Sequence, residues 1–257
     1  MLNQIKAEWT KLVTTKAVWW TTFIFLLLSI GMSAIAALSA KLGARDAGVD
    51  AGFLTPDMAL NGLFALGLPV LMIQAAMVFT SEYRHNIASM TFSANPHRTQ
   101  VIVAKWLLYG VIATVLTFVA VIGAYWVGIQ IASGAADSSM VFSFSDDTAR
   151  RLMWVYPLYA FTLVTLTIGV ALLIRQTAGV VSLMLIWFIA LEAVIGMLWT
   201  LGEKVVRFLP FTNFNAFMRE TDVAGSPLSW QQSLWLYLAW VAAIFIIGTV
   251  VANRRDV

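Results

Sequence analysis

The sequence predicts an all-α integral membrane protein with six transmembrane helices. Two features of its composition indicate this: 60% of the 257 residues are hydrophobic and only 11% are charged, whereas soluble domains carry about 25% charged residues. A water-soluble chain of this length could not hide so much apolar surface in one core. The third indication is the distribution of the apolar residues along the sequence. Apolar windows of roughly 20 residues recur along the whole chain, and this is the length that crosses the hydrocarbon layer.

The apolar windows are nearly free of charge, and the fifth contains a single acid, Glu192. A helix satisfies its own backbone hydrogen bonds within lipid, so each window is expected to be helical. We predict one transmembrane domain over residues 1–257. Its spans lie at about 18–40, 58–80, 101–131, 152–174, 178–201 and 231–251.

Residues 1–17 have the pattern of an amphipathic helix ahead of the first span. Apolar side chains recur at helical spacing along one face, with polar residues opposite. The apolar positions are Leu2, Ile5, Trp9, Leu12 and Val13. We predict an elbow helix in the headgroup layer, followed by an anchor at Trp19 and Trp20. A solvated basic leader is the alternative, although Trp9 would be poorly used in water.

The segment 203–229, between spans five and six, is too apolar for a free loop. Its central run, VVRFLPFTNFNAFM, is also too short and too broken to cross the membrane. We predict one or two short helices that dip back into the outer leaflet. The fold class is therefore six spans with an amphipathic elbow helix and a re-entrant extracellular segment.

An even number of spans places both termini on one side of the membrane, and lysine and arginine favour the cytoplasmic side. The termini, the segment 81–105 and the turn between spans four and five carry Lys6, Lys11, Lys16, Arg84, Arg98, Lys105, Arg175, Arg254 and Arg255. The opposite segments carry Lys41, Arg45, Arg150, Arg151, Lys204, Arg207 and Arg219, offset by more acids. We predict a multi-pass protein of the cytoplasmic (plasma) membrane with both termini in the cytoplasm.

The residues that most catalytic and cofactor sites require are missing. The chain has no cysteine, and its two histidines, His85 and His97, both lie in the segment 81–100. The signatures of phosphate-binding loops, zinc proteases and serine nucleophiles are absent. We expect no catalytic residue, no metal and no cofactor in this chain. The net charge of +3 is too small and scattered to indicate nucleic acid as a partner.

The segment 81–100 is a polar, basic island between two spans. It opens with Glu82-Tyr83-Arg84, passes through a helix-compatible run, and ends with Asn95-Pro96-His97-Arg98 ahead of Ala104-Lys105. This string resembles the cytoplasmic loop between spans two and three of ATP-binding-cassette (ABC) transporter permeases of the type-2 export class. The family pattern is roughly E-[YF]-R, a Gly-Thr pair, an apolar run, P-x-R and a lysine. Here Asn86-Ile87 replaces Gly-Thr.

The resemblance implies partners. Two such permeases pair, often as a homodimer, and two separate ATPase subunits, which bind ATP and Mg²⁺, contact a coupling helix in the loop. The ATPase-coupling residues here would be Glu82, Tyr83, Arg84, Ile87, Met90, Phe92, Pro96 and Arg98. An apolar anchor with a polar rim is typical of a docking patch. The alternative is that Glu82 and Arg84 cap and solvate the end of span two.

The resemblance also implies a substrate path along spans two and five. Its side chains here would be Asn61, Phe64, Gln74, Trp187, Phe188 and Glu192. A charge near mid-bilayer costs about 2.5–3.5 kcal/mol on insertion scales. Glu192 is therefore expected to recognise a cationic substrate, form a proton-sensitive gate or make a structural hydrogen bond, unless it is solvated at the interface. The aromatic residues have packing or headgroup anchoring as their alternative.

These expectations describe the permease subunit of an ATP-driven exporter of an amphipathic or hydrophobic substrate, such as a drug, a peptide antibiotic or a lipid-linked molecule. An ATPase-independent secondary transporter or channel is one alternative. Such transporters often have repeated halves, and no convincing repeat relates residues 1–130 to 131–257. A membrane scaffold or sensor that recruits a cytoplasmic partner is the other alternative.

Overall fold

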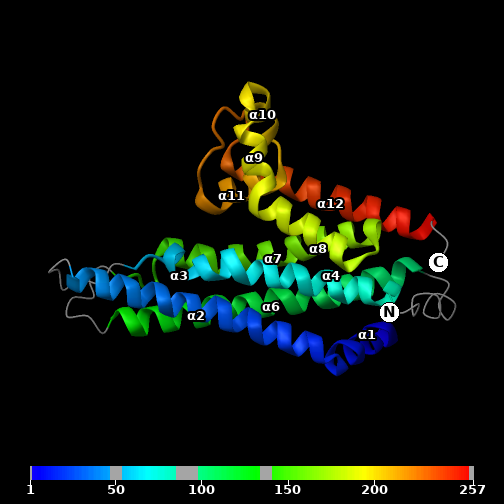
Figure 1. The fold of residues 1–257 in the computed structure, drawn as a ribbon, viewed down its shortest axis with the longest axis horizontal. Helices are drawn as coiled ribbons and strands as arrows, with labels where there is room; N and C mark the ends of the chain where they lie inside the picture. The colour runs from blue at the N-terminus through cyan, green and yellow to red at the C-terminus, as the bar shows by residue number, and fades with distance from the viewer. Residues whose placement is uncertain (1, 47–53, 85–97, 134–140, 255–257) are drawn as a thin grey trace. The chain divides into compact units, whose positions relative to one another are not determined.

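The computed structural model describes residues 2–46, 54–84, 98–133 and 141–254 of the chain, and Figure 1 shows its helices. In these ranges the regular secondary structure is helical, apart from one isolated bridge between Leu54 and Val141. The prediction of an all-α protein is therefore confirmed. The helices are α1 (Leu2–Thr14), α2 (Lys16–Asp46), α3 (Pro56–Gly62), η1 (Leu63–Gly67), α4 (Leu68–Arg84), α6 (Arg98–Ala132), α7 (Asp147–Ile174), α8 (Thr177–Ile186), η2 (Trp187–Leu191), α9 (Glu192–Met197), α10 (Trp199–Val206), α11 (Pro210–Arg219) and α12 (Trp230–Arg254).

Six helical segments are long and apolar enough to cross a membrane, as predicted. They are Lys16–Gly43, Pro56–Ser81, Thr99–Ala132, Asp147–Ile174, Thr177–Met197 and Trp230–Arg254. The chain is a multi-pass membrane protein. The fifth span is shorter than the predicted 178–201, because the backbone of Leu198 leaves the helical region (φ −84°, ψ 81°). A separate helix, α10, begins directly after this bend, ahead of the predicted start of the segment 203–229.

Spans two and five each contain a five-residue π-helical segment that the sequence analysis did not predict. In span two, η1 joins α3 to α4, and in span five, η2 joins α8 to α9. Pro69, just after η1, has no backbone N–H and leaves the carbonyl of Ala65 without its usual α-helical donor. This accounts for an irregular turn at η1. The residues of η2 include neither proline nor glycine, and nothing in their sequence marks a π segment.

The chain divides into two compact units. Unit 1 comprises Met1–Glu8, Ala75–Tyr109 and Thr162–Val257, and unit 2 comprises Trp9–Gln74 and Gly110–Phe161. The helices α1, α4, α6 and α7 thus supply residues to both units. Each unit has its own set of buried contacts.

In unit 2, α2 packs closely on α3 and η1. A Cβ atom at Gly62 would collide with the Cβ atom of Met32, and one at Gly67 would collide with Oγ of Ser29. Ser33 Oγ also donates a hydrogen bond of 2.7 Å to the carbonyl of Ala124 on α6. Small residues therefore let these helices approach until backbone and side-chain atoms touch, which is the usual way membrane helices pack.

In unit 1, the second half of α7 is surrounded by other helices, and Leu163, Val164 and Leu166 are fully buried. Thr165 Oγ1 accepts a hydrogen bond of 2.8 Å from Trp106 Nε1 on α6, and Gly169 faces α12. A Cβ atom at Gly169 would lie 2.9 Å from the backbone nitrogen of Phe245 on α12. The small side chains of α7 therefore permit close helix packing.

The two glycines Gly62 and Gly31 provide a matched pair for testing the packing of unit 2. Gly62→Ala should lower the free energy of unfolding by about 1–3 kcal/mol, because the new methyl group overpacks against Met32. Gly31→Ala should leave stability unchanged or raise it by up to about 1 kcal/mol, because open space surrounds that position and alanine is the better helix former. Thermal unfolding of both variants in detergent measures the difference. Equal shifts in the same direction would contradict the packing described.

Candidate functional site

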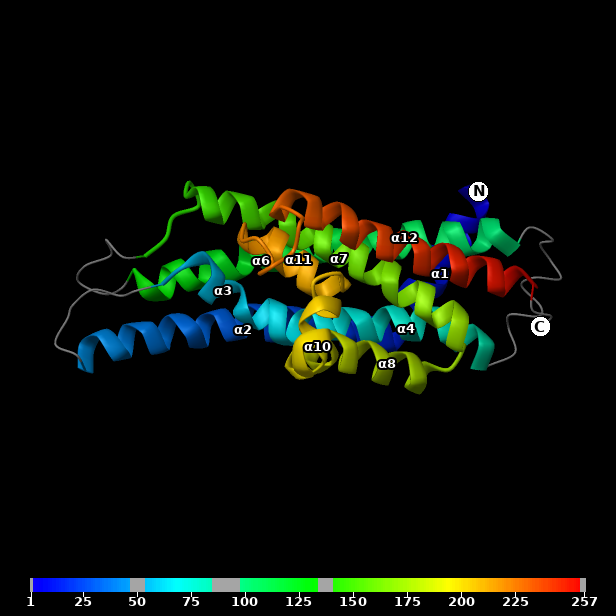
Figure 2. The same ribbon diagram turned by 90° about the horizontal axis from the view of Figure 1, so that it is seen from above.

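Several helix ends of unit 1 meet at one end of that unit, which we call the loop end because α4 and α6 border the segment 85–97 there (Figures 1 and 2). Thr80 and Thr177 join α4 to α8 through a 2.6 Å hydroxyl–hydroxyl hydrogen bond. Asn253 Nδ2 donates to Thr99 Oγ1 over 2.9 Å, joining α12 to α6. The ends of α4, α6, α8 and α12 therefore lie together at this end of unit 1.

The predicted ATPase-coupling residues lie at this loop end or beyond it. Glu82, Tyr83 and Arg84 form the last turn of α4, and Arg98 is the first residue of α6. The remaining predicted residues, Ile87, Met90, Phe92 and Pro96, lie outside the described residues. The structure thus places the two borders of the loop, and the contacts of the loop itself stay a prediction.

A buried ion pair ties α1 to α6 near the loop end. Lys105 Nζ lies 3.4 Å from Glu8 Oε2, with the two side chains 5% and 6% exposed. The same ammonium group lies 5.4 Å from the ring centroid of Phe79 on α4, a favourable cation–π geometry. Lys105 belongs to the loop motif of the sequence, whereas no motif includes Glu8. One lysine therefore holds together three helices of unit 1.

In span two, the predicted path residues have different surroundings. Asn61 is exposed, just before η1, and Phe64 lies within η1, stacked on Tyr159 at a centroid distance of 6.4 Å. Gln74 is only 1% exposed, and its Nε2 donates to the carbonyl of Val18 over 3.0 Å. In this conformation the amide of Gln74 holds α4 to the start of α2. Asn61 remains the accessible polar side chain of the three.

In span five, the predicted path residues come together around Phe211 of α11. Trp187 and Phe188 both meet its ring edge to face, at centroid distances of 5.7 and 5.4 Å. Glu192 is 6% exposed, so it is not solvated. Its Oε1 accepts hydrogen bonds from Trp187 Nε1 (3.0 Å) and from the backbone N–H of Phe211 (2.9 Å).

The other oxygen of the Glu192 carboxylate binds the next residue of α11. Oε2 accepts from the backbone N–H of Thr212 (2.6 Å) and from Thr212 Oγ1 (2.7 Å). The first amides of a helix have no partner within it, and Leu209, at the N-cap of α11, supplies no side-chain cap. Glu192 therefore caps α11 from a different helix, and its charge suits the positive end of the helix dipole. All its contacts are donors, as a carboxylate requires.

The turn that leads into α11 is held by further side chains of unit 1. Asn213 Nδ2 donates to the carbonyls of Arg207 and Leu209, each over 2.8 Å. Trp240 Nε1 on α12 donates to the carbonyl of Phe208 over 2.8 Å, and Figure 1 shows α11 against α12. The sequence analysis missed these partners, since they are separated in sequence and follow no motif.

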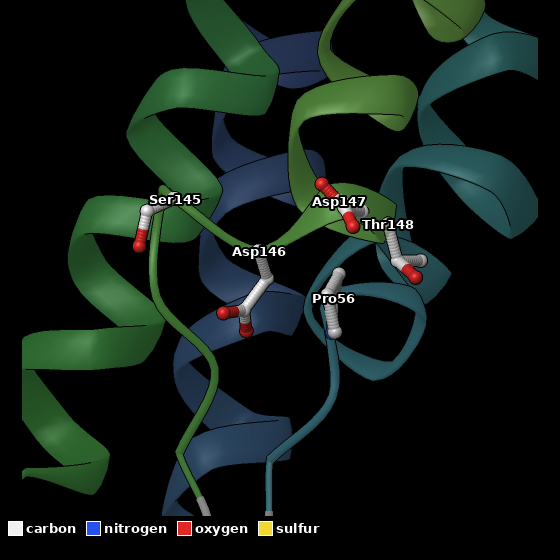
Figure 3. A pocket seen from close by; sticks show the side chains of 5 residues that line it. All are labelled: Pro56, Ser145, Asp146, Asp147 and Thr148. Atoms are coloured by element: carbon white, nitrogen blue, oxygen red, sulfur yellow. The ribbon is translucent and has the colours of Figure 1, made fainter.

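A separate open cleft of about 480 Å³ lies in unit 2, at the start of α3 and α7 (Figure 3). Its lining residues are Pro56, Ser145, Asp146, Asp147 and Thr148. Asp146 Oδ2 accepts from the backbone N–H of Ser143 over 2.9 Å, and Asp147 pairs with Arg150 one turn later. These acids therefore begin α7. Within the described ranges, no cluster of three His, Cys, Asp or Glu side chains could hold a metal ion.

The sequence matches no protein-family model, and no curated protein matches it significantly. What can be said of the chain's function therefore depends on its residues and their geometry.

The cap on α11 predicts the effect of removing the Glu192 charge. Glu192→Gln keeps one acceptor oxygen but turns an NH₂ group toward donors, so it should lower the free energy of unfolding by about 1.5–3 kcal/mol. Hydrogen exchange at Phe211 and Thr212 should accelerate as well. Thr212→Val, which removes only the hydroxyl donor, is the control and should cost about 1 kcal/mol. Unchanged exchange at α11 in the Glu192 variant would refute the cap.

The ion pair of Glu8 and Lys105 predicts a strong coupling between two substitutions. Lys105→Met strands a buried carboxylate and should cost about 3–5 kcal/mol, whereas adding Glu8→Leu should restore much of the loss. A double-mutant cycle from thermal unfolding measures the coupling. Additive effects of the two substitutions would show that the pair does not hold α1 to α6.

Proposed function

We propose that this chain is the transmembrane permease subunit of an ABC exporter of the type-2 class. It moves an amphipathic or hydrophobic molecule, such as a drug, a peptide antibiotic or a lipid-linked molecule, out of the cell. Energy comes from a separate cytoplasmic ATPase subunit that binds ATP and Mg²⁺. A second copy of the permease completes the transporter as a homodimer.

The observation that carries this proposal is the loop end of unit 1. A partner that moves the segment 85–97 acts directly on α4 and α6. Those helices are bonded to α8 through Thr80, to α12 through Thr99 and to α1 through Lys105. A displacement of one short loop is thereby delivered to several helices at once. This is the mechanical arrangement that a permease without its own ATP site requires.

The two π segments support the assignment of the path to spans two and five. π segments inside helices are frequent at functional sites. Here Phe64 lies in η1, and Trp187 and Phe188 lie in η2. Asn61 lies two residues before η1, and Glu192 directly follows η2. In the proposed transporter, aromatic side chains offer an apolar route, and Glu192 acts on that route by positioning α11.

The remaining features fit the proposed topology. The loop end faces the cytoplasm of a plasma membrane, α1 serves as the elbow helix, and α10 and α11 form the re-entrant segment at the opposite face. The exposed apolar residues of this outer region, among them Leu198 and Phe208, then contact the outer leaflet. This arrangement does not require the chain itself to catalyse a reaction.

Affinity purification from the organism's own membrane, followed by mass spectrometry, tests the proposal. We expect a protein with a phosphate-binding loop to co-elute, and the reconstituted complex to hydrolyse ATP faster when substrate is present. A chain that co-elutes with no ATPase under any nucleotide condition, but transports alone, would instead be a secondary transporter or channel. A non-ATPase cytoplasmic partner would indicate a scaffold.

The double variant Glu82→Ala and Arg98→Ala tests the coupling contact. These residues border the loop on its two sides, and loss of a docking contact should reduce substrate-stimulated ATP hydrolysis and export about tenfold or more. The protein should still insert, as membrane fractionation checks. Glu203→Ala with Lys204→Ala, two exposed charges of α10, is the control and should export normally. Normal export by the first variant would contradict the coupling role.

A further inference from the structure

The junction of α1 and α2 forms a sharp corner within unit 2. A single residue, Thr15, separates the two helices, and its backbone N–H bonds the carbonyl of Leu12 over 3.2 Å. Trp19 Nε1 reaches back across the corner and donates to the carbonyl of Val13 over 2.7 Å. The indole ring of Trp19 is therefore held in place beside the junction.

An open cleft of about 440 Å³ lies at this corner, within the size range of small-molecule sites. It is lined by Lys16, Trp19, Trp20 and Phe23. The three aromatic side chains are 60%, 66% and 55% exposed, in chain order, and Trp20 meets Phe23 edge to face at 6.2 Å. The cleft thus combines a broad aromatic wall with one cation, at the beginning of a transmembrane span.

The charges around the corner are positive. Lys6, Lys11 and Lys16 are all exposed. The first 45 residues contain one acid, Glu8, and its carboxylate is turned inward to the ammonium of Lys105. The exposed residues of α1 and of the start of α2 are therefore basic or neutral, and this surface attracts anions.

Two donors in the cleft are unused within the described part of the chain. Lys16 forms no ion pair there, and the indole N–H of Trp20 makes no hydrogen bond, although that of Trp19 does. An ammonium group and an indole N–H are suitable donors to a phosphate. Aromatic rings and a basic residue at the end of a span are also the pattern of a membrane interface.

We propose that this cleft binds an anionic glycerophospholipid from the leaflet that α1 contacts. Lys16 and the Trp20 indole N–H hold the phosphate, while Trp19 and Phe23 pack against the glycerol and the first carbons of an acyl chain. A soluble anion would leave this aromatic wall unused, and a zwitterionic lipid would gain less from the surplus of lysines. The inference is independent of the ATPase, because the residues that line the cleft all lie at the corner of α1 and α2.

Native mass spectrometry of the purified full-length chain in detergent tests the lipid site. Phosphatidylglycerol and phosphatidylcholine with the same acyl chains are the probes. The wild-type chain should bind the first lipid more tightly. Lys16→Gln should weaken phosphatidylglycerol binding about fivefold, the effect of one lysine near an anionic headgroup, and weaken phosphatidylcholine binding less, because the choline cation offsets the charge of its phosphate. Trp20→Phe, which keeps a ring but loses the N–H, should weaken it to a smaller extent.

Lys41→Gln, at the other end of the same span, is the matched control because it removes the same charge outside the cleft. It should leave the lipid preference intact. Equal loss in the Lys16 and Lys41 variants would show a general charge effect and overturn the proposal. So would equal binding of the two lipids by the wild-type chain, or unchanged phosphatidylglycerol binding by the Lys16 variant. Neither lysine is buried, so each variant is expected to fold.

Discussion

A polar group within lipid must find its hydrogen-bond partner inside the protein, and this constraint governs both how the chain folds and how its helices meet. Gln74 donates to the carbonyl of Val18 near the start of α2, and Ser33 donates to a carbonyl of α6. Tyr237 donates from α12 to Thr162 of α7. Each bond replaces water that the bilayer cannot supply, and each therefore selects a particular neighbour among otherwise similar apolar helices.

The start of α11 is where the same constraint has the largest consequence. A short helix whose first amides are buried needs an acceptor, and its own N-cap residue, Leu209, offers none. Glu192, the first residue of α9 directly after η2, supplies two carboxylate oxygens. A buried charge is costly unless it is paired or richly hydrogen-bonded, so the carboxylate and the helix end satisfy each other. The position of α11 then follows from span five, and a movement of η2 would also move α11.

The sequence was sufficient for the six spans, because their apolar length is a local property that the membrane sets directly. It was not sufficient for the partners of Glu192, since Thr212 lies 20 residues away and belongs to no motif. Pro69 accounts for η1 only once the structure is known, and nothing in the sequence indicates η2. Gln74 shows a different limit of the sequence. A polar residue within a span suggests a substrate path, yet the amide of Gln74 bonds to α2 and holds that helix in place. The sequence alone cannot distinguish these roles, because both require the same side chain.

The charges of α1 show how one buried contact can define an outer surface. Glu8 and the lysines at positions 6 and 11 lie on one short helix, where an acid would ordinarily offset its basic neighbours in solvent. Turning Glu8 toward Lys105 removes that acid from the surface and removes the lysine of span three with it. The helix then keeps its basic residues outside and a neutral pair inside. The buried pair that holds α1 to α6 is thus also the reason that its exposed side can attract an anionic leaflet.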